Sequence, residues 1–138
     1  MMHQPPLVLV ADDEHLIAET LVEILESEGF RALSVSDGAA AVRVARAEEP
    51  DVLVCDVVMP ILNGVEAAKQ ISRYLPEVCI ILFSGQAAAG DAIDAARDEG
   101  HQFVIFAKPV RPELLIAEIR RQLSTRSPVI SERQRKAM

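Results

Sequence analysis

The chain lacks tryptophan, has few aromatic residues and contains only two cysteines in 138 residues. Two cysteines are too few for a disulfide framework. Cys55 and Cys79 each lie inside an apolar run, which predicts buried structural thiols and not a redox pair. No histidine has a second histidine or a cysteine at metal-ligand spacing, so there is no zinc-site signature. We expect His3, His15 and His101 to face solvent.

Basic charge is also scarce, because 14 lysines and arginines oppose 21 acidic residues for a formal net charge of −7. Nucleic-acid binding requires a basic surface that displaces phosphate counterions, so we expect no direct binding to nucleic acid. Residues 125–138 differ: four basic residues against one acidic residue give +3, which leaves −10 for residues 1–124. We expect a flexible basic tail there; a short docking segment for an acidic partner is the alternative.

Long apolar runs are absent as well. No stretch approaches the roughly 20 apolar residues of a membrane span, and the N-terminal Met-Met-His-Gln-Pro-Pro lacks the features of a signal peptide. We therefore predict a cytoplasmic protein without membrane contact. Its length and its hydrophobic content of 50% suit one domain, placed at residues 1–124 with the tail at 125–138.

Five short apolar runs alternate with helical patterns along the chain. The predicted strands lie near residues 7–11, 31–35, 51–55, 78–83 and 103–107. Five repeats of strand then helix favour an α/β fold, a doubly wound five-stranded parallel sheet with helices on both faces.

The helices are predicted from apolar positions three and four residues apart. The first spans residues 14–28 and should end at Gly29 as a glycine-capped helix. Three pairs form its expected buried face: Leu16/Ile17, Thr20/Leu21 and Ile24/Leu25. The third is expected at 63–75, and the fifth begins at Pro112, which suits a first helical position. The fourth, at 87–99, has one large apolar residue, so we expect it to bury little and to be mobile.

Acidic residues stand at the ends of two predicted strands, Asp12 and Asp13 after the first and Asp56 after the third. Ligands bind parallel sheets at the carboxyl ends of strands. Three carboxylates there would repel one another, and a hard cation such as Mg²⁺ relieves that repulsion. Asp13 and Asp56 could bind it directly, with Asp12 holding a water. One carboxylate could also be a nucleophile that forms an aspartyl phosphate. Asp56 with Lys108, which follows the fifth strand, suits those parts.

Residues 7–124 closely resemble the receiver domain of two-component response regulators. The motifs that carry the resemblance are Asp12-Asp13, Asp56-Val57-Val58-Met59-Pro60 followed by Asn63-Gly64, Phe83-Ser84-Gly85, and Lys108-Pro109. The resemblance implies a flavodoxin-like sheet with strand order 2-1-3-4-5 and five helices. It also implies a cis Lys108-Pro109 bond.

The same resemblance implies a function. Asp56 would accept a phosphoryl group from a sensor histidine kinase or a phosphotransfer protein, with Mg²⁺ held by Asp13, Asp56 and the backbone carbonyl of Val58. Lys108 would pair with one phosphoryl oxygen. Ser84 would bond another and reshape the surface of the fourth helix, fifth strand and fifth helix. Such a protein assists its own phosphorylation and dephosphorylation but is no enzyme on external substrates. It acts on an unknown downstream protein. A phosphorylation-dependent homodimer is compatible with this interpretation, but the sequence does not decide the oligomeric state.

Two positions depart from the family pattern. Ile105 stands where receivers commonly have tyrosine or phenylalanine, and the segment from Gly100 to Lys108 is one residue longer than usual. Phe103 or Phe106 could substitute if a bulge shifts the register, although alternation places Phe106 on the opposite face from Ile105. The other departure is Val58, where many relatives have a polar side chain that orients the hydrolytic water. We predict slow self-dephosphorylation.

Three interpretations of the whole chain follow. The first is a stand-alone receiver that signals by contact or shuttles phosphate, because only 14 residues follow the fifth helix. The second is a fragment of a longer regulator with an output domain. The third is a phosphorylation-independent interaction module, which the intact acids, Ser84 and Lys108 disfavour. A hydrolase of external phosphate esters lacks a loop that could enclose a substrate. A nucleotide-binding domain is excluded because Ala11-Asp12-Asp13-Glu14 replaces the glycine-rich turn.

Overall fold

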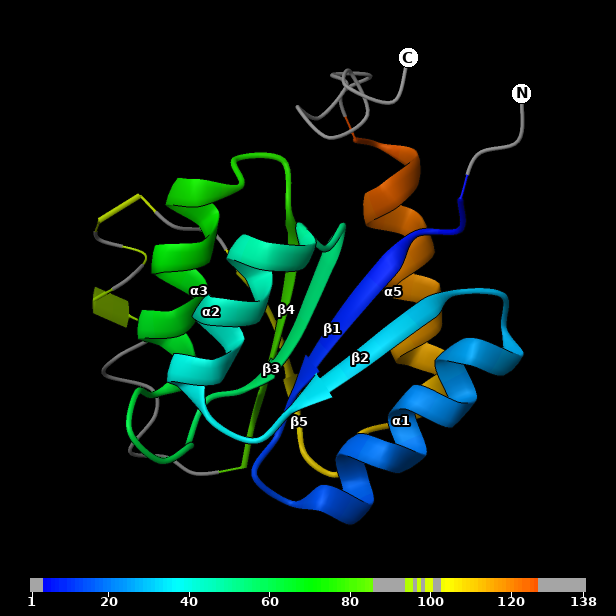
Figure 1. The fold of residues 1–138 in the computed structure, drawn as a ribbon, viewed down its shortest axis with the longest axis horizontal. Coiled ribbons are helices and arrows are strands. Elements are labelled where there is room, and N and C mark those ends of the chain that lie inside the picture. Colours follow the sequence, from blue (N-terminus) through cyan, green and yellow to red (C-terminus); the bar gives the residue numbers. More distant parts are fainter. Residues whose placement is uncertain (1–3, 86–93, 96, 98, 101–102, 127–138) are drawn as a thin grey trace.

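The computed structural model describes residues 4–85, 94–95, 97, 99–100 and 103–126 (Figure 1). Five parallel strands form one sheet in the order β2-β1-β3-β4-β5, which confirms the expected flavodoxin-like topology. The strands are β1 (Leu7–Ala11), β2 (Arg31–Val35), β3 (Val52–Asp56), β4 (Cys79–Ser84) and β5 (Val104–Ala107). The described helices are α1 (His15–Ser27), α2 (Gly38–Glu48), α3 (Gly64–Tyr74) and α5 (Pro112–Ser124).

The helices cover both faces of the sheet, with α2 and α3 on one side and α1 and α5 on the other (Figure 1). Alternate side chains of each central strand point to opposite faces, so Leu9 and Leu53 pack with α2 and α3 while Val8 and Val54 pack with α1 and α5. Every residue of β1 and β3 is buried. This two-sided burial explains why these strands read as continuous apolar runs.

Helix α1 ends close to its predicted position, with Gly29 just beyond it at a φ of 94°. Its predicted buried face is only partly right. Leu16 is 77% exposed, and the buried residues are Ala18, Leu21 and Leu25. At about 100° per residue, Leu16 lies about 200° from Ala18 and therefore points away from the sheet. Thr20 is exposed for the same reason.

The predicted fourth helix falls mainly outside the described residues. Asp94, Ala95 and Arg97 are helical, and the Glu99 N–H donates to the Ala95 carbonyl at 3.1 Å, in agreement with the end of the predicted helix. The expected mobility of that helix therefore stays a prediction. His3, His101 and residues 127–138 of the predicted tail also lie outside the description.

The end of α5 is tied to the amino edge of the sheet. Arg126 donates a hydrogen bond to Asp51 at 2.9 Å, and the other carboxylate oxygen of Asp51 accepts from the Leu7 N–H at 2.8 Å. Thr125 and Arg126 therefore contact the folded unit, although the domain boundary near residue 124 stays a prediction.

Both cysteines are buried and free, which confirms their expected structural role. His15 is exposed, as predicted. Among the described residues, no helix is both long and apolar enough to cross a membrane.

Candidate functional site

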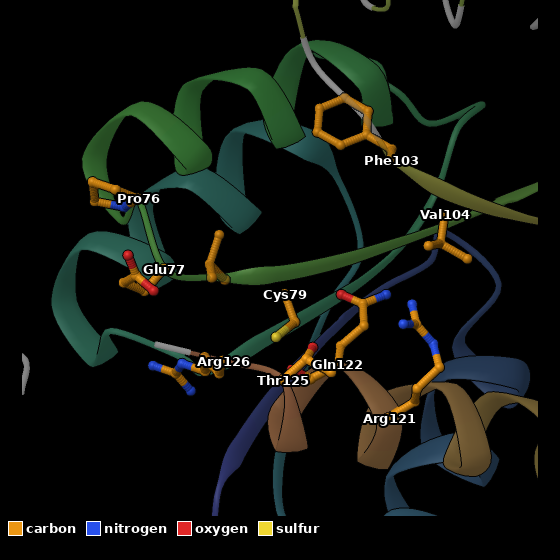
Figure 2. Close-up of a pocket in the computed structure, with 10 residues that line it drawn as sticks. Pro76, Glu77, Cys79, Phe103, Val104, Arg121, Gln122, Thr125 and Arg126 are labelled. Atoms are coloured by element: carbon orange, nitrogen blue, oxygen red, sulfur yellow. The ribbon is translucent and has the colours of Figure 1, made fainter. Parts of the chain in front are cut away.

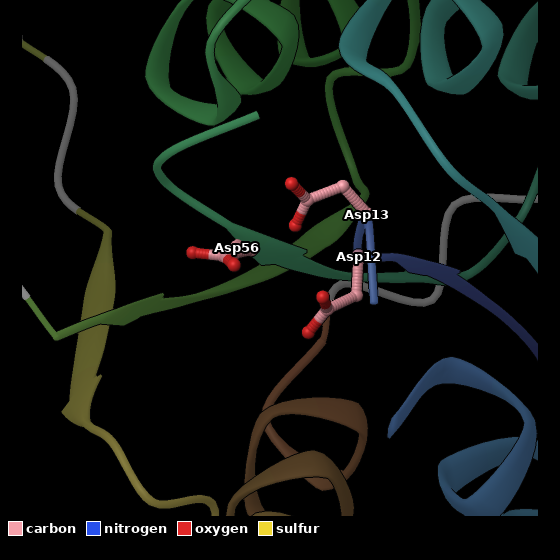
Figure 3. A group of neighbouring side chains, drawn as sticks. All are labelled: Asp12, Asp13 and Asp56. Atoms are coloured by element: carbon pink, nitrogen blue, oxygen red, sulfur yellow. The ribbon is translucent and has the colours of Figure 1, made fainter. Parts of the chain in front are cut away.

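Three carboxylates meet at the carboxyl edge of the sheet (Figure 3). Strands β1 and β3 are neighbours with Ala11 opposite Cys55, so Asp12 and Asp56 follow side by side, and Asp13 comes next. One oxygen from each of the three lies within 4.8 Å of the other two. The structure thus brings together the three acids that the sequence placed at neighbouring strand ends, with Asp56 as the last residue of β3.

Two of these acids are almost fully buried. Asp12 is 2% exposed and Asp56 is 5% exposed. Burial raises the pKa of Asp12, as do the charges of Asp56 and Asp13, while a hydrogen bond from the Glu14 N–H and the charge of Lys108 act to lower it. Within the described part of the chain, Asp12 Oδ2 is a buried oxygen that accepts no hydrogen bond. A buried carboxylate oxygen that accepts no hydrogen bond, beside two other carboxylates, suits the oxygen-ligand preference of Mg²⁺.

Lys108 supplies the positive charge at this site. Its Nζ donates to Asp56 Oδ2 at 2.6 Å and lies 3.9 Å from Asp12 Oδ2. Burial acts to lower the pKa of Lys108, but the hydrogen bond and charge of Asp56 outweigh it, so the pKa is raised. Lys108 follows β5, and its N–H donates to the Ser84 carbonyl at 3.2 Å. The Lys108-Pro109 bond is cis, as the resemblance implied.

Ser84 occupies the last position of β4. Phe83, the residue before it, pairs with Asp56 in β3, and Ser84 itself pairs with Ala107 in β5. Ser84 is therefore one residue further along the sheet edge than Asp56 and one strand away. Its side chain is half-buried.

The loop between β3 and α3 begins at the acidic site. The Val58 N–H donates to Asp56 Oδ1 at 3.3 Å, and the Val58 side chain is 47% exposed. Ile61 has a φ of 70°, and the Leu62 N–H donates to the Pro60 carbonyl at 2.8 Å across it. This is a strained γ-turn, in a conformation that a β-branched residue rarely adopts. Sequence reasoning missed the turn because isoleucine does not signal one.

Helix α3 is anchored to the same loop. Asn63 Oδ1 accepts from the Glu66 N–H at 2.9 Å and caps the helix, while the Gly64 N–H donates to the Val57 carbonyl at 2.8 Å. A Cβ on Gly64 would come within 2.9 Å of the carbonyl carbon of Asp56. The Asn63-Gly64 motif is thus explained by a cap and a close backbone approach.

No bulge shifts the register of the described part of β5. Pairing with β4 is continuous from Val104 to Ala107. Ile105 packs on the α2/α3 side of the sheet, while Phe106 packs on the α1/α5 side with its ring centroid 6.3 Å from that of Phe83. Phe106 therefore does not replace an aromatic residue at position 105. Phe103 lies on the same side as Ile105 but before the strand begins.

Lys69 is a buried charge that sequence reasoning did not single out. It is 7% exposed and forms ion pairs with Glu99 at 2.6 Å and with Glu66 at 3.1 Å. Hydrogen bonds to these two carboxylates raise its pKa. Glu66, three residues earlier on α3, was the only available sequence signal, whereas Glu99 is brought near by the fold. The pair with Glu99 ties α3 to the turn before β5.

The surface of the described residues also has recesses outside the carboxylate cluster. A polar recess of about 480 Å³ is found at the amino edge of the sheet, around Cys79 and the end of α5 (Figure 2). Its cationic side chains have carboxylate partners, because Arg121 pairs with Glu118 and Arg126 with Asp51. An apolar recess of about 350 Å³ lies between α1 and the loop after β5, and Lys108 forms part of its lining. Only the second adjoins the acidic site.

A doubly wound parallel sheet with an acidic cluster at its carboxyl edge defines a flavodoxin-like protein of the receiver type. The comparisons with known proteins agree. A sequence model of the response regulator receiver domain matches residues 8–120, and the chain belongs to this family. The receiver domain is a signalling module.

Two curated relatives from Mycobacterium tuberculosis are similar to this chain. The probable transcriptional regulatory protein TcrX is 32% identical over 117 residues, which cover 85% of this chain and 49% of TcrX. The transcriptional regulatory protein PdtaR is 38% identical over 99 residues, which cover 70% of this chain and 46% of PdtaR. The chain thus spans about half the length of these relatives.

Solved structures show the same fold. A CheY-like receiver domain protein from Methanospirillum hungatei superimposes with a TM-score of 0.80 at 21% identity, covering 88% of this chain and 95% of that one. The receiver domain of a signal transduction histidine kinase from Syntrophus aciditrophicus gives a TM-score of 0.78 at 26% identity, covering 91% and 96%.

Proposed function

We propose that this receiver accepts a phosphoryl group on Asp56 from the phosphohistidine of a sensor kinase or phosphotransfer protein, with Mg²⁺ as its cofactor. The observation that carries the proposal is the contact of 2.6 Å between Lys108 Nζ and Asp56 Oδ2 inside a cluster of three carboxylates. Charge compensation of a nearly buried aspartate explains such a contact in part. A nucleophile that must bind an anionic donor does require such a cation.

In the proposed transfer, a carboxylate oxygen of Asp56 attacks the phosphorus. The P–N bond breaks, and the imidazole leaves with the electron pair. Lys108 shifts from the carboxylate to a phosphoryl oxygen and offsets its charge. Asp13, Asp56 and the backbone carbonyl of Val58 would hold Mg²⁺, with Asp12 acting through a water. The bound ion would neutralise negative charge on the phosphoryl oxygens.

The proposed output begins at Ser84. Its hydroxyl would donate to a phosphoryl oxygen, and the loop after β4 would move with it. The new group carries about −1.5 to −2 charges, enough to bias a loop with two conformations. Ser84 and Lys108 are already joined through the backbone, so the change would pass to β5 and α5 and to the surface between them and the predicted fourth helix. A phosphorylation-dependent homodimer through that surface is part of the same proposal.

The donor protein is proposed to dock beside Asp56 on α1 and the loop after β5. Leu16 is 77% exposed there, and the apolar recess includes Ile17 and Val110 as well as Lys108. An exposed leucine next to an apolar recess suits an apolar partner surface. Leu16→Ala should slow transfer from a phosphorylated histidine phosphotransfer protein and leave the rate with acetyl phosphate unchanged. If Leu16→Ala and the wild type accepted the phosphoryl group from the protein donor at the same rate, this docking site would be contradicted.

The relatives bear on what the receiver controls. TcrX and PdtaR are each about twice as long as the segment they share with this chain, and both are called transcriptional regulatory proteins. Their length favours a receiver that acts on an attached output domain over a stand-alone receiver. We propose the attached form, with a separate downstream protein as the alternative.

The direct test is phosphorylation of the purified chain with acetyl phosphate, with and without Mg²⁺, read by intact mass because the chain has no tryptophan for a fluorescence assay. The wild type should gain one phosphoryl group only with Mg²⁺. Asp56→Asn should gain none, whereas Asp94→Asn, which changes an exposed aspartate, should match the wild type. A gain that persists in Asp56→Asn, or no gain in the folded wild type, would overturn the proposal.

A further inference from the structure

The first turn of α2 touches the loop that carries the acidic site. Gly38 is the first residue of α2 and is buried. A Cβ built on it would lie 2.7 Å from the carbonyl carbon of Leu62, and closer still to the carbonyl oxygen, where ordinary contact begins at 3.4 Å. The obstacle is backbone and not a flexible side chain. Only glycine allows the loop to lie this close to α2.

Helix formation does not explain glycine at this position. Gly38 is helical with no positive φ, and alanine is the better helix former at such a site. The helix already has its cap, because Asp37 Oδ1 accepts from the Ala40 N–H at 2.7 Å. The close approach to Leu62 is therefore the feature that requires the missing side chain.

The contact falls at the strained part of the loop. Leu62 is the residue whose N–H closes the γ-turn around Ile61, and it lies between that turn and the Asn63 cap of α3. Backbone held in a rarely populated conformation persists only where its surroundings fix it. Gly38 contacts the loop on the far side of the turn from Asp56, so the loop is held at both ends.

We propose that Gly38 is a positioning residue of the acidic site. Its bare α-carbon lets α2 hold the loop from Val57 to Asn63, and so sets where the backbone of Val58 lies relative to Asp56. An alanine would push the carbonyl of Leu62 away by a large part of an ångström. Displacements of about 1 Å at a site cost as much as 100-fold in rate. The part of this inference that concerns Mg²⁺ rests on the proposed function, whereas the part that concerns the loop does not.

The experiment compares Gly38→Ala with Gly29→Ala. Gly29 has a φ of 94° and nothing near its missing Cβ, so alanine there strains the backbone at the opposite edge of the sheet without touching the loop. Both variants should lose stability in urea. Only Gly38→Ala should speed amide exchange at Leu62 and Gly64, and only it should weaken Mg²⁺ binding, by tenfold or more in a titration with Mg²⁺ alone followed by NMR.

Each outcome decides the inference. Unchanged amide exchange in the loop of folded Gly38→Ala would overturn it, and so would an unchanged Mg²⁺ affinity despite faster exchange. The inference would also be overturned if Gly29→Ala changed loop exchange and Mg²⁺ affinity as much as Gly38→Ala. A wild type that binds no Mg²⁺ would instead count against the proposed function, and loop exchange would then decide the role of Gly38 alone. If Gly38→Ala does not fold, Asp37→Ala loosens the same helix turn. It should speed loop exchange and weaken Mg²⁺ binding two- to threefold, and wild-type values would overturn the inference.

Discussion

Lys108 forms ion pairs with both buried carboxylates of the site, and its removal should therefore destabilise the protein. Its Nζ lies 2.6 Å from Asp56 and 3.9 Å from Asp12, and the three side chains are 23%, 7% and 2% exposed. Removing one partner of a buried ion pair costs about 3–5 kcal/mol. Because water reaches Lys108, we expect Lys108→Ala to lower the free energy of unfolding by roughly 2–3 kcal/mol.

Urea unfolding followed by far-ultraviolet circular dichroism, in the presence of EDTA, measures this loss. With a slope of about 1–3 kcal/mol per molar urea, the midpoint should fall by roughly 0.7–3 M. Lys108→Met keeps most of the aliphatic stem and should lose nearly as much, since the charge and not the packing is at issue. Mg²⁺ should stabilise both variants more than the wild type.

Removing a negative charge from the site should have the opposite effect to removing Lys108. Asp12→Asn removes one of the two buried negative charges, so it should raise the stability of the metal-free protein and restore part of the stability of Lys108→Ala. An unfolding midpoint of Lys108→Ala equal to that of the wild type would refute the electrostatic account. A Lys108→Met variant as stable as the wild type would do the same.

Three further predictions concern single side chains. Val58→Asn should shorten the lifetime of phospho-Asp56 severalfold, because it places a polar group at a half-exposed position beside the acceptor. The lifetime is measured by loss of the phosphoryl mass, and Val58→Ala should leave it unchanged. An unchanged lifetime in Val58→Asn would contradict the hypothesis of slow self-dephosphorylation. Ile61→Asn should raise the free energy of unfolding by about 1 kcal/mol in urea, since asparagine tolerates a positive φ and Ile61 is 82% exposed; a loss of stability would show that the side chain is needed. Arg126→Ala should lower the free energy of unfolding by about 1 kcal/mol through loss of the hydrogen bond to Asp51. An unchanged free energy of unfolding would place Arg126 outside the folded unit.

The positions of the acids could be predicted because they depend on two local signals. Apolar runs locate the strands, and all strands of a parallel sheet end at the same edge, so Asp12, Asp13 and Asp56 had to be close. Strand β5 begins one residue later than predicted, and strands β3 and β4 each begin and end one residue later than predicted. This places Asp56 and Ser84 within their strands and not after them, because both residues continue the pairing with the neighbouring strand.

Contacts between distant segments could not be predicted in the same way. Leu16 looked like part of a buried face because it stands next to Ile17, but only the helix orientation decides which of the two meets the sheet. Gly38 was not singled out by sequence reasoning, because its contact with Leu62 depends on how α2 packs. The ion pair between Lys69 and Glu99 likewise joins residues that are 30 positions apart.

The aliphatic side chain of Ile105 limits how the proposed movement of Ser84 could be passed on to its neighbours. Alternation along the strand placed Phe106 opposite Ile105, and the continuous pairing of β4 with β5 confirms it. Phe106 is held by the core cluster under α1 and α5 and stacks against Phe83. Phe106 is only partly buried, but turning toward Ser84 would break its contacts with this cluster and with Phe83, which costs free energy. A movement of Ser84 on phosphorylation would have to be followed by the aliphatic Ile105, which needs less space than an aromatic ring and offers no hydroxyl to a partner.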